Sequence, residues 1–133
     1  TNLDLSGLKD RTVRFITDDV IKFTQREKRR GNFYDAIIMD PPSYGRGPNG
    51  ELWKLEDNLF DLIEICREVL VEKPLFFLIN TYATSISPTA IKNMLDITIK
   101  NRFGGSTSAE EIGLPMSSSH LVLPCGAFGR WEV

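Results

Sequence analysis

Short apolar runs alternate with longer amphipathic segments along this 133-residue chain. Runs rich in β-branched and aromatic residues predict strands at 13–17, 34–39 and 75–79. Apolar residues at helical spacing predict helices at 19–30, 55–70 and 87–100. The second and third strand runs are continuously apolar, as in strands that are buried on both faces of a parallel sheet. This order predicts an α/β fold, built from βαβ units around a mainly parallel sheet.

Local signals support these boundaries. Asp18-Asp19 can cap the first helix, Gly31 follows its cationic last turn, and Ser87-Pro88 is a typical helix start. The cations of that last turn offset the helix dipole or, alternatively, contact RNA. Prolines after Asp40 end the second strand and open a loop to about residue 54. Segments 104–112 and 120–123 then predict an antiparallel return at the C-terminus.

Composition narrows the class of protein. Hydrophobic residues make up 41% of the chain, charged residues 26%, and the net charge is −2, which fits one ordinary globular domain and argues against nucleic-acid binding by bulk charge alone. We expect no membrane helix and no signal peptide, and therefore a cytoplasmic protein. Cys66 falls on an apolar helix face, Cys125 is expected to be small and buried, and the lone His120 is expected to be structural or exposed, so we expect no metal site.

The candidate functional residues are those that follow the ends of the predicted strands, because ligands of open α/β sheets bind beyond the carboxyl ends of the strands. This directs attention to Asp18-Asp19, to the segment from Asp40 to Tyr44, and to Asn80-Thr81-Tyr82. The Asp40 carboxylate and the Pro41 carbonyl can together accept both hydrogens of an amino group, leaving its nitrogen lone pair free. The alternative is that Asp-Pro-Pro only ends a strand.

A resemblance to a known family favours the chemical interpretation. The run from Tyr34 to Pro48, YDAIIMDPPSYGRGP, resembles the fourth motif of class I S-adenosylmethionine-dependent methyltransferases, in particular the bacterial group related to large-subunit ribosomal-RNA methyltransferases. VRFITDDV at 13–20 is similar to the segment whose acidic residue meets the cofactor adenine, and LPCGA at 123–127 matches the closing segment. The resemblance implies a Rossmann-like fold, S-adenosylmethionine as cofactor and RNA as substrate.

Roles are carried over by position. The resemblance implies that three residues hold the cofactor: Asp18, Asp19 and Val20. It implies a methyl-transfer site lined by Asp40, Pro41 and Pro42. Substrate contacts are expected from Ser43, Tyr44, Arg46, Asn80 and Thr81.

Two departures from the family qualify this assignment. The glycine-rich first motif and the ribose-binding acid are absent, so we interpret residues 1–133 as the C-terminal portion of one catalytic domain whose N-terminal half would lie before Thr1. We expect the chain alone to bind the cofactor weakly and to be inactive. No cysteine follows the 75–79 strand, where carbon-methylating relatives carry their nucleophile, so the expected acceptor is a nitrogen of an RNA base or, alternatively, another heteroatom.

Two alternatives stay open. The chain can be a non-catalytic α/β fragment or interaction module that lacks cofactor binding. A nucleotide-dependent oxidoreductase is disfavoured, because the G-x-G-x-x-G match at 45–50 begins five residues after Asp40, contains Pro48 and does not open a helix. A mobile substrate loop is the better interpretation of that segment, with Arg46, Trp53 and Lys54 placed to meet nucleic acid or to anchor the loop.

Overall fold

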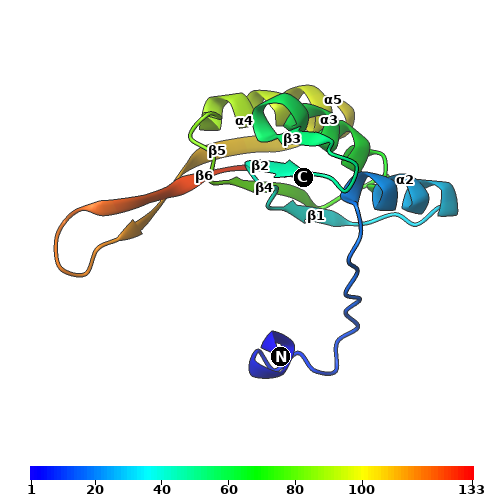
Figure 1. Ribbon diagram of the computed structural model, residues 1–133, viewed down its shortest axis with the longest axis horizontal. Helices are drawn as coiled ribbons and strands as arrows, with labels where there is room; N and C mark the ends of the chain where they lie inside the picture. Colours follow the sequence, from blue (N-terminus) through cyan, green and yellow to red (C-terminus); the bar gives the residue numbers. More distant parts are fainter.

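One mixed sheet forms the centre of the computed structural model, which describes residues 1–133 (Figure 1). Its strand order is β1-β4-β6-β5. The bounds are β1 (Ala36–Met39), β4 (Phe76–Thr81), β5 (Ser106–Pro115) and β6 (Val122–Glu132). β1 runs parallel to β4, whereas β6 is antiparallel to both β4 and β5. The predicted α/β fold with a C-terminal antiparallel return is therefore confirmed.

The helices follow the predicted boundaries closely. They are α1 (Asn2–Leu5), α2 (Val20–Arg30), α3 (Leu55–Arg67), α4 (Pro88–Leu95), the π-helical turn η1 (Asp96–Lys100) and α5 (Asn101–Phe103). The Asp19 side chain caps α2 by accepting from the Lys22 amide, and Gly31 ends the helix in the left-handed conformation. The Ser87 side chain caps α4 by accepting from the Ala90 amide. Local capping chemistry thus sets where these helices begin and end.

The core lies between the sheet and the layer of α3, α4 and η1. Phe77, Ile79 and Trp131 point from the sheet into this layer and are completely buried. From the helices they meet Leu55, Leu59, Ile63, Ile91, Leu95 and Ile99, which are also completely buried. Gly129 lets the layers approach closely, since a Cβ there would lie 2.2 Å from Ile91 Cγ2. Cys66 belongs to the same core, as the helical pattern predicted.

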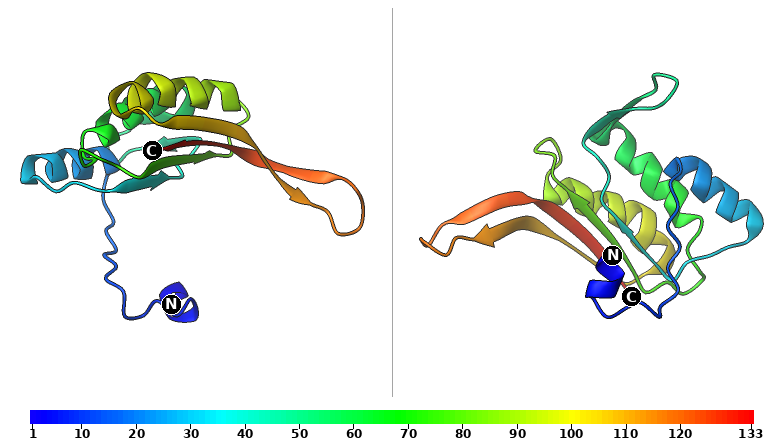
Figure 2. Two further views of the ribbon diagram at one scale, coloured as in Figure 1. Left: turned by 180° about the vertical axis from the view of Figure 1, so that it is seen from behind. Right: turned by 60° about the horizontal axis from the view of Figure 1, so that its bottom comes forward.

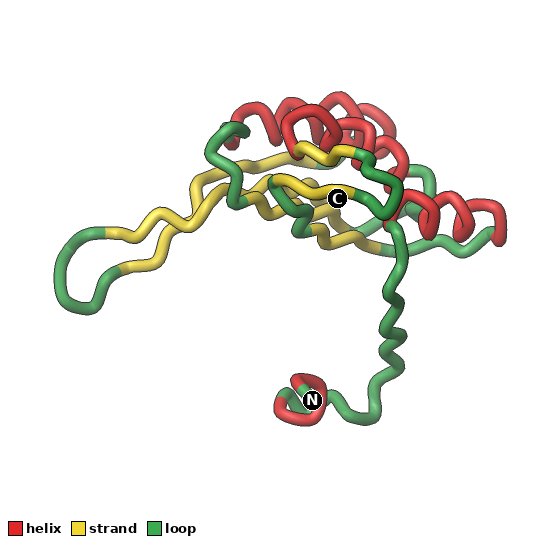
Figure 3. Tube along the Cα trace, in the orientation of Figure 1, coloured by secondary structure: helices red, strands yellow, loops and turns green.

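The other face of the sheet is bare (Figures 2 and 3). Helices α3, α4 and α5 all lie on one side of the sheet. The opposite face carries a mainly apolar groove lined by Ile38, Phe76, Leu78, Asn80, Ile112, Phe128 and Arg130. Ile38 is 65% exposed on β1, which also leaves one edge of the sheet unpaired. The prediction that the apolar runs at 34–39 and 75–79 are buried on both faces is therefore wrong for this chain.

The segment Val13–Thr17 does not form the predicted strand. The segment is extended and exposed, and it lies away from the sheet together with α1 (Figure 1). The physical reason is that a strand exists only through hydrogen bonds to a neighbouring strand, and no part of the chain pairs with this segment. Its apolar pattern is nevertheless that of a strand.

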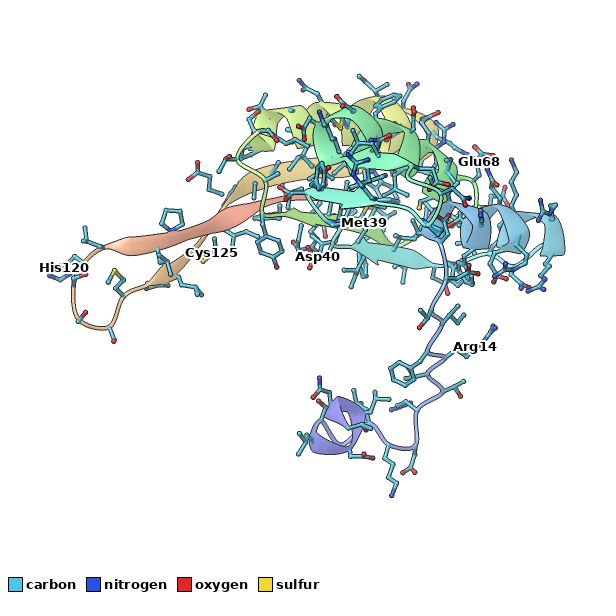
Figure 4. All side chains as sticks on the ribbon, viewed as in Figure 1. Arg14, Met39, Asp40, Glu68, His120 and Cys125 are labelled. Carbon is cyan, nitrogen blue, oxygen red and sulfur yellow. The ribbon has the colours of Figure 1, made fainter.

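Two hairpins lie in regions for which the sequence predicts a loop or short strands. Residues 44–54, predicted as a mobile loop, form a hairpin of β2 (Tyr44–Arg46) and β3 (Leu52–Lys54). β5 and β6 continue beyond the sheet as a long arm whose tip carries the exposed His120 (Figure 4). β6 therefore starts at Val122, two residues later than predicted, and continues far past residue 123. None of the helices has the length and hydropathy that a membrane crossing requires.

Candidate functional site

Asp40 stands at the carboxyl end of β1, directly beside the end of β4. The register pairs Met39 with Ile79, so Asp40 and Asn80 are the next residues along two parallel strands. Asp40 is exposed, and its carboxylate makes neither a hydrogen bond nor an ion pair within the chain. Figure 4 shows its side chain below the sheet, away from the helices. The Asp40 carboxylate therefore has no partner within the chain, and its role toward a ligand stays a prediction.

The loop after Asp40 is held in place from both sides. Pro41 is buried, and its carbonyl accepts no hydrogen bond. The Pro42 carbonyl accepts from the Trp53 indole N–H at 2.7 Å, and the Ser43 carbonyl accepts from the Leu55 amide at 3.0 Å. The Asp40 carboxylate and the Pro41 carbonyl are therefore two acceptors without a partner in the chain, on a segment that hydrogen bonds from Trp53 and Leu55 hold in place.

The β2–β3 hairpin has one polar and one packed face. Tyr44 pairs with Lys54, and Arg46 pairs with Leu52, so these four side chains share one face, on which Tyr44 is 57% exposed. Neither Arg46 nor Lys54 forms an ion pair. Trp53 lies on the other face and packs against the core, which favours the second of its two expected roles, anchoring of the loop. The exposed face combines an aromatic ring with two free cations.

Asn80 and Thr81 point to opposite sides of β4. Asn80 lines the groove on the bare face, whereas the Thr81 side chain is completely buried toward the helices and its hydroxyl has no partner. The Thr81 side chain therefore cannot touch a substrate, contrary to the prediction. Tyr82, which belongs to the strand end that the sequence singles out but has no predicted role, is 63% exposed two residues beyond Asn80. The sequence signal for Tyr82 is the same as for Asp40, since both residues follow the end of a predicted strand.

The predicted cofactor residues lie at the start of α2. Asp18 accepts from the Asp19 amide with one carboxylate oxygen and from Arg26 with the other at 2.5 Å, and these hydrogen bonds hold the pKa of Asp18 below its ordinary value. Asp19 uses one oxygen to cap the helix, so its second oxygen is free. Val20 is the first helical residue, whose amide has no acceptor within a helix.

An open cleft of about 420 Å³ lies against this segment. Its lining consists of Arg14, Ile16, Asp18, Val20, Phe23 and Tyr34. The wall is mainly apolar, with a carboxylate at one point. Asp40 is not part of this lining, so the structure does not bring the predicted cofactor residues and the transfer site into one cavity.

Cys125 is only partly buried, which corrects the expectation of a buried thiol. Its Sγ donates to the Leu123 carbonyl at 3.3 Å, at the base of the β5–β6 arm. The neighbouring Gly126 (φ +126°) lies against the end of β4, where an added Cβ would be 2.1 Å from the Thr81 carbonyl oxygen. No group of three or more histidine, cysteine or acidic residues is arranged to hold a metal ion.

A solved structure superposes on almost the whole chain. A SAM-dependent methyltransferase from Agrobacterium tumefaciens superposes on 98% of this chain with a TM-score of 0.83 and 36% identity. The chain has the class I methyltransferase fold. A Streptococcus mutans structure described as a SAM-dependent methyltransferase also covers 98% of the chain, with a TM-score of 0.66 and 20% identity, and shares that fold.

The matches to curated relatives by sequence cover less of the chain than the structural matches do. Ribosomal RNA large subunit methyltransferase I of Photobacterium profundum is 37% identical over 43 residues, 32% of this chain and 11% of that protein. The protein of the same name from Erwinia tasmaniensis is 40% identical over 48 residues, 36% of this chain and 12% of that protein. No family model matches. The chain also spans only 43% of the Agrobacterium protein. The resemblance seen in the sequence is confirmed.

Proposed function

We propose that this chain is the C-terminal portion of an S-adenosylmethionine-dependent methyltransferase domain that methylates a nitrogen of an RNA base. The observation that carries the proposal is the pair of unused acceptors at Asp40 and Pro41, at the carboxyl end of a strand. It occurs in a fold shared with a 36% identical SAM-dependent methyltransferase. A ribosomal RNA substrate, suggested by the names of the sequence relatives, would place the reaction in the cytoplasm.

The acceptor side of the reaction would be built from Asp40, Pro41 and Asn80. An exocyclic amine has two hydrogens, and the Asp40 carboxylate and the Pro41 carbonyl would accept one each. The nitrogen lone pair would then point away from both acceptors, toward the methyl donor. As the new carbon–nitrogen bond forms, the bond between the methyl carbon and the donor sulfur would break, with its electron pair left on the sulfur, and the amine would give up one proton to Asp40. Catalysis of this kind rests on positioning, and no covalent intermediate is required.

The cofactor side fits the residues at the start of α2. S-adenosylmethionine, when bound, supplies an electrophilic methyl group. Its adenine is flat and carries an amino group, and the apolar cleft beside Val20 and Phe23 suits a flat ring. Asp19 has one free carboxylate oxygen to accept from that amino group, whereas both oxygens of Asp18 are engaged. Asp19 is therefore the better adenine partner, and Asp18 would keep the segment in shape through Arg26.

RNA would be held by the exposed face of the β2–β3 hairpin. Tyr44 can stack on a base, and the free cations Arg46 and Lys54 can contact phosphates. Ser43 and Pro42 would line the entrance, and Tyr82 would add a second exposed ring near Asn80. Few charges are involved, so a net charge of −2 is compatible with a local RNA contact.

Further chain of the same domain would complete the fold. The unpaired edge of β1, the bare apolar face of the sheet and the unpaired segment 13–17 all support this proposal. So does the 43% share of the Agrobacterium protein that the chain spans. The glycine-rich motif would belong to that missing part. We therefore expect residues 1–133 alone to bind S-adenosylmethionine weakly and to transfer no methyl group.

The test is tritiated methyl transfer from S-adenosylmethionine to total RNA, using residues 1–133 extended by the upstream sequence of their reading frame. We expect labelled RNA, and a loss of about a hundredfold or more in Asp40→Asn, which keeps the shape but removes the charge. Thr84→Ala is a matched control on an exposed loop position. Full activity of Asp40→Asn would refute its role.

Two other outcomes would replace the proposal. Mass spectrometry of the labelled nucleoside identifies the methylated atom, and a carbon-methylated base whose formation is lost in Cys125→Ala would overturn the nitrogen assignment. An extended protein that binds no cofactor and labels nothing would favour the non-catalytic interaction module.

A further inference from the structure

Trp53 joins the β2–β3 hairpin to the loop that follows Asp40. Its indole N–H donates to the Pro42 carbonyl at 2.7 Å, and its ring packs against the hydrophobic core. Two residues later, the Leu55 amide donates to the Ser43 carbonyl. The segment Pro41–Ser43 is thus held by two donors, one from β3 and one from the first residue of α3.

We infer that Trp53 is a positioning residue, which sets the direction of the Pro41 carbonyl by fixing the next peptide group; this inference rests on the proposed function. In Pro41-Pro42 both φ angles are restricted by the rings, so the ψ rotations are the main remaining freedom of the segment. A hydrogen bond to the Pro42 carbonyl removes most of that freedom. The Pro41 carbonyl, which has no partner of its own, is then held in the direction that a substrate amine would meet.

The hairpin geometry separates this role from substrate contact. Trp53 pairs with Gly45, and its ring lies on the face opposite to Tyr44 and Arg46. Gly45 has no side chain to compete for the space beside the indole ring. The ring is directed to the core and its only polar atom is used by Pro42, so Trp53 acts on a substrate through the loop rather than by touching it.

The chain offers a matched control. Trp131 also donates its indole N–H to a loop carbonyl, that of Gly104, at 2.6 Å. It is completely buried and lies at the other end of the sheet, since it pairs with Phe77 near the start of β4. Trp53→Phe and Trp131→Phe therefore remove the same donor atom, but only the first removes it from the Asp40 loop.

The first measurement is amide hydrogen exchange of Asp40 and residues 43–46 in the 133-residue chain, since Pro41 and Pro42 have no amide hydrogen; it needs no activity. Loss of a neutral hydrogen bond predicts that exchange of this segment becomes about two- to tenfold faster in Trp53→Phe. In Trp131→Phe the segment should exchange as in the parent chain. Unchanged exchange in Trp53→Phe would overturn the inference, whether or not the protein proves to be a methyltransferase.

The second measurement is steady-state methyl transfer by the extended protein. Misplacement of one acceptor predicts that Trp53→Phe lowers kcat by about tenfold or more and leaves the KM for S-adenosylmethionine within about twofold. Trp131→Phe should lose thermal stability and keep its kcat. A fall in kcat of similar size in both variants would overturn the inference, because it would reveal a general loss of packing. Absence of transfer by the parent protein would refute the proposed function and leave the exchange test valid.

Discussion

Replacing Gly126 by alanine tests how tightly the base of the β5–β6 arm is fitted to the end of β4. Gly126 has a φ of +126°, a conformation that residues with a Cβ rarely adopt. An added Cβ would lie 2.1 Å from the Thr81 carbonyl oxygen, 3.1 Å from its carbon and 3.2 Å from Tyr82 Cα. All three are backbone atoms in or next to a strand that pairs with β6, so they cannot move aside without disturbing that pairing.

The loss of stability expected for Gly126→Ala has two parts. Holding alanine at this φ costs about 1–3 kcal/mol, and forcing an extra methyl group into a closed space costs about 1–3 kcal/mol more. We therefore expect Gly126→Ala to lower the free energy of unfolding by about 2–6 kcal/mol. Gly31→Ala separates the two parts, because Gly31 has a φ of +72° and nothing within 4 Å of an added Cβ. That variant should lose only about 1–2 kcal/mol.

Urea unfolding followed by circular dichroism measures both variants on the same scale, provided that the slope of the transition is unchanged. Alanine restricts the unfolded chain similarly at both positions, so this contribution cancels in the comparison. The difference between the variants then reports the clash at the Thr81 carbonyl together with the greater backbone strain at φ +126°. A Gly126→Ala protein within about 0.5 kcal/mol of Gly31→Ala would refute the reasoning, because the strand end would then have room to relax.

Three further predictions concern charge and thiol chemistry. The hydrogen bond from the Tyr34 hydroxyl holds the pKa of the buried Glu27 below its ordinary value of 4.5. The stability that the Glu27 carboxylate contributes is therefore present above about pH 5 and is lost as the pH falls through the lowered pKa. Glu27→Gln should flatten this loss of stability in acid, as measured by urea titrations. Burial raises the pKa of the Cys66 thiol to about 11, so Ellman's reagent at pH 8 should leave it unmodified in the native chain and modify both cysteines in urea. The double variant Arg46→Ala/Lys54→Ala should weaken single-stranded RNA binding in fluorescence anisotropy and lower the salt dependence by about 1.4 log units per log unit of salt; an unchanged slope would exclude both phosphate contacts.

Features set by neighbouring residues could be predicted from the sequence. The ends of α2 and α4 depend on Asp19, Gly31 and Ser87, whose capping bonds reach only a few residues away. The apolar spacing of α3 likewise placed Cys66 in the core. Asp40 could be located because the prolines after it end a strand, and the edge of the sheet follows from the strand direction.

Features set by distant partners could not be predicted in the same way. Val13–Thr17 has the pattern of a strand, but a strand also needs a neighbour, which pattern alone does not reveal. The strands of the β2–β3 hairpin are three residues each, too short for an alternating pattern to stand out, and their turn depends on Glu51, which accepts from the Asn49 amide. The buried direction of Thr81 depends on which face of the sheet the helices cover.

The position of Asp40 on an edge strand bears on how the site would work. β1 is the last strand of the sheet on that side, so Asp40 has β4 and Asn80 on one flank and no strand on the other. The acceptor residues, the hairpin and the Trp53 contact all lie within these 133 residues, whereas the cofactor residues at the start of α2 do not share a cavity with Asp40. Strands added at the β1 edge would lie between the two groups. We therefore expect variants of Asp19 to change cofactor affinity only in the extended protein, and variants of Arg46 to change RNA binding already in this chain.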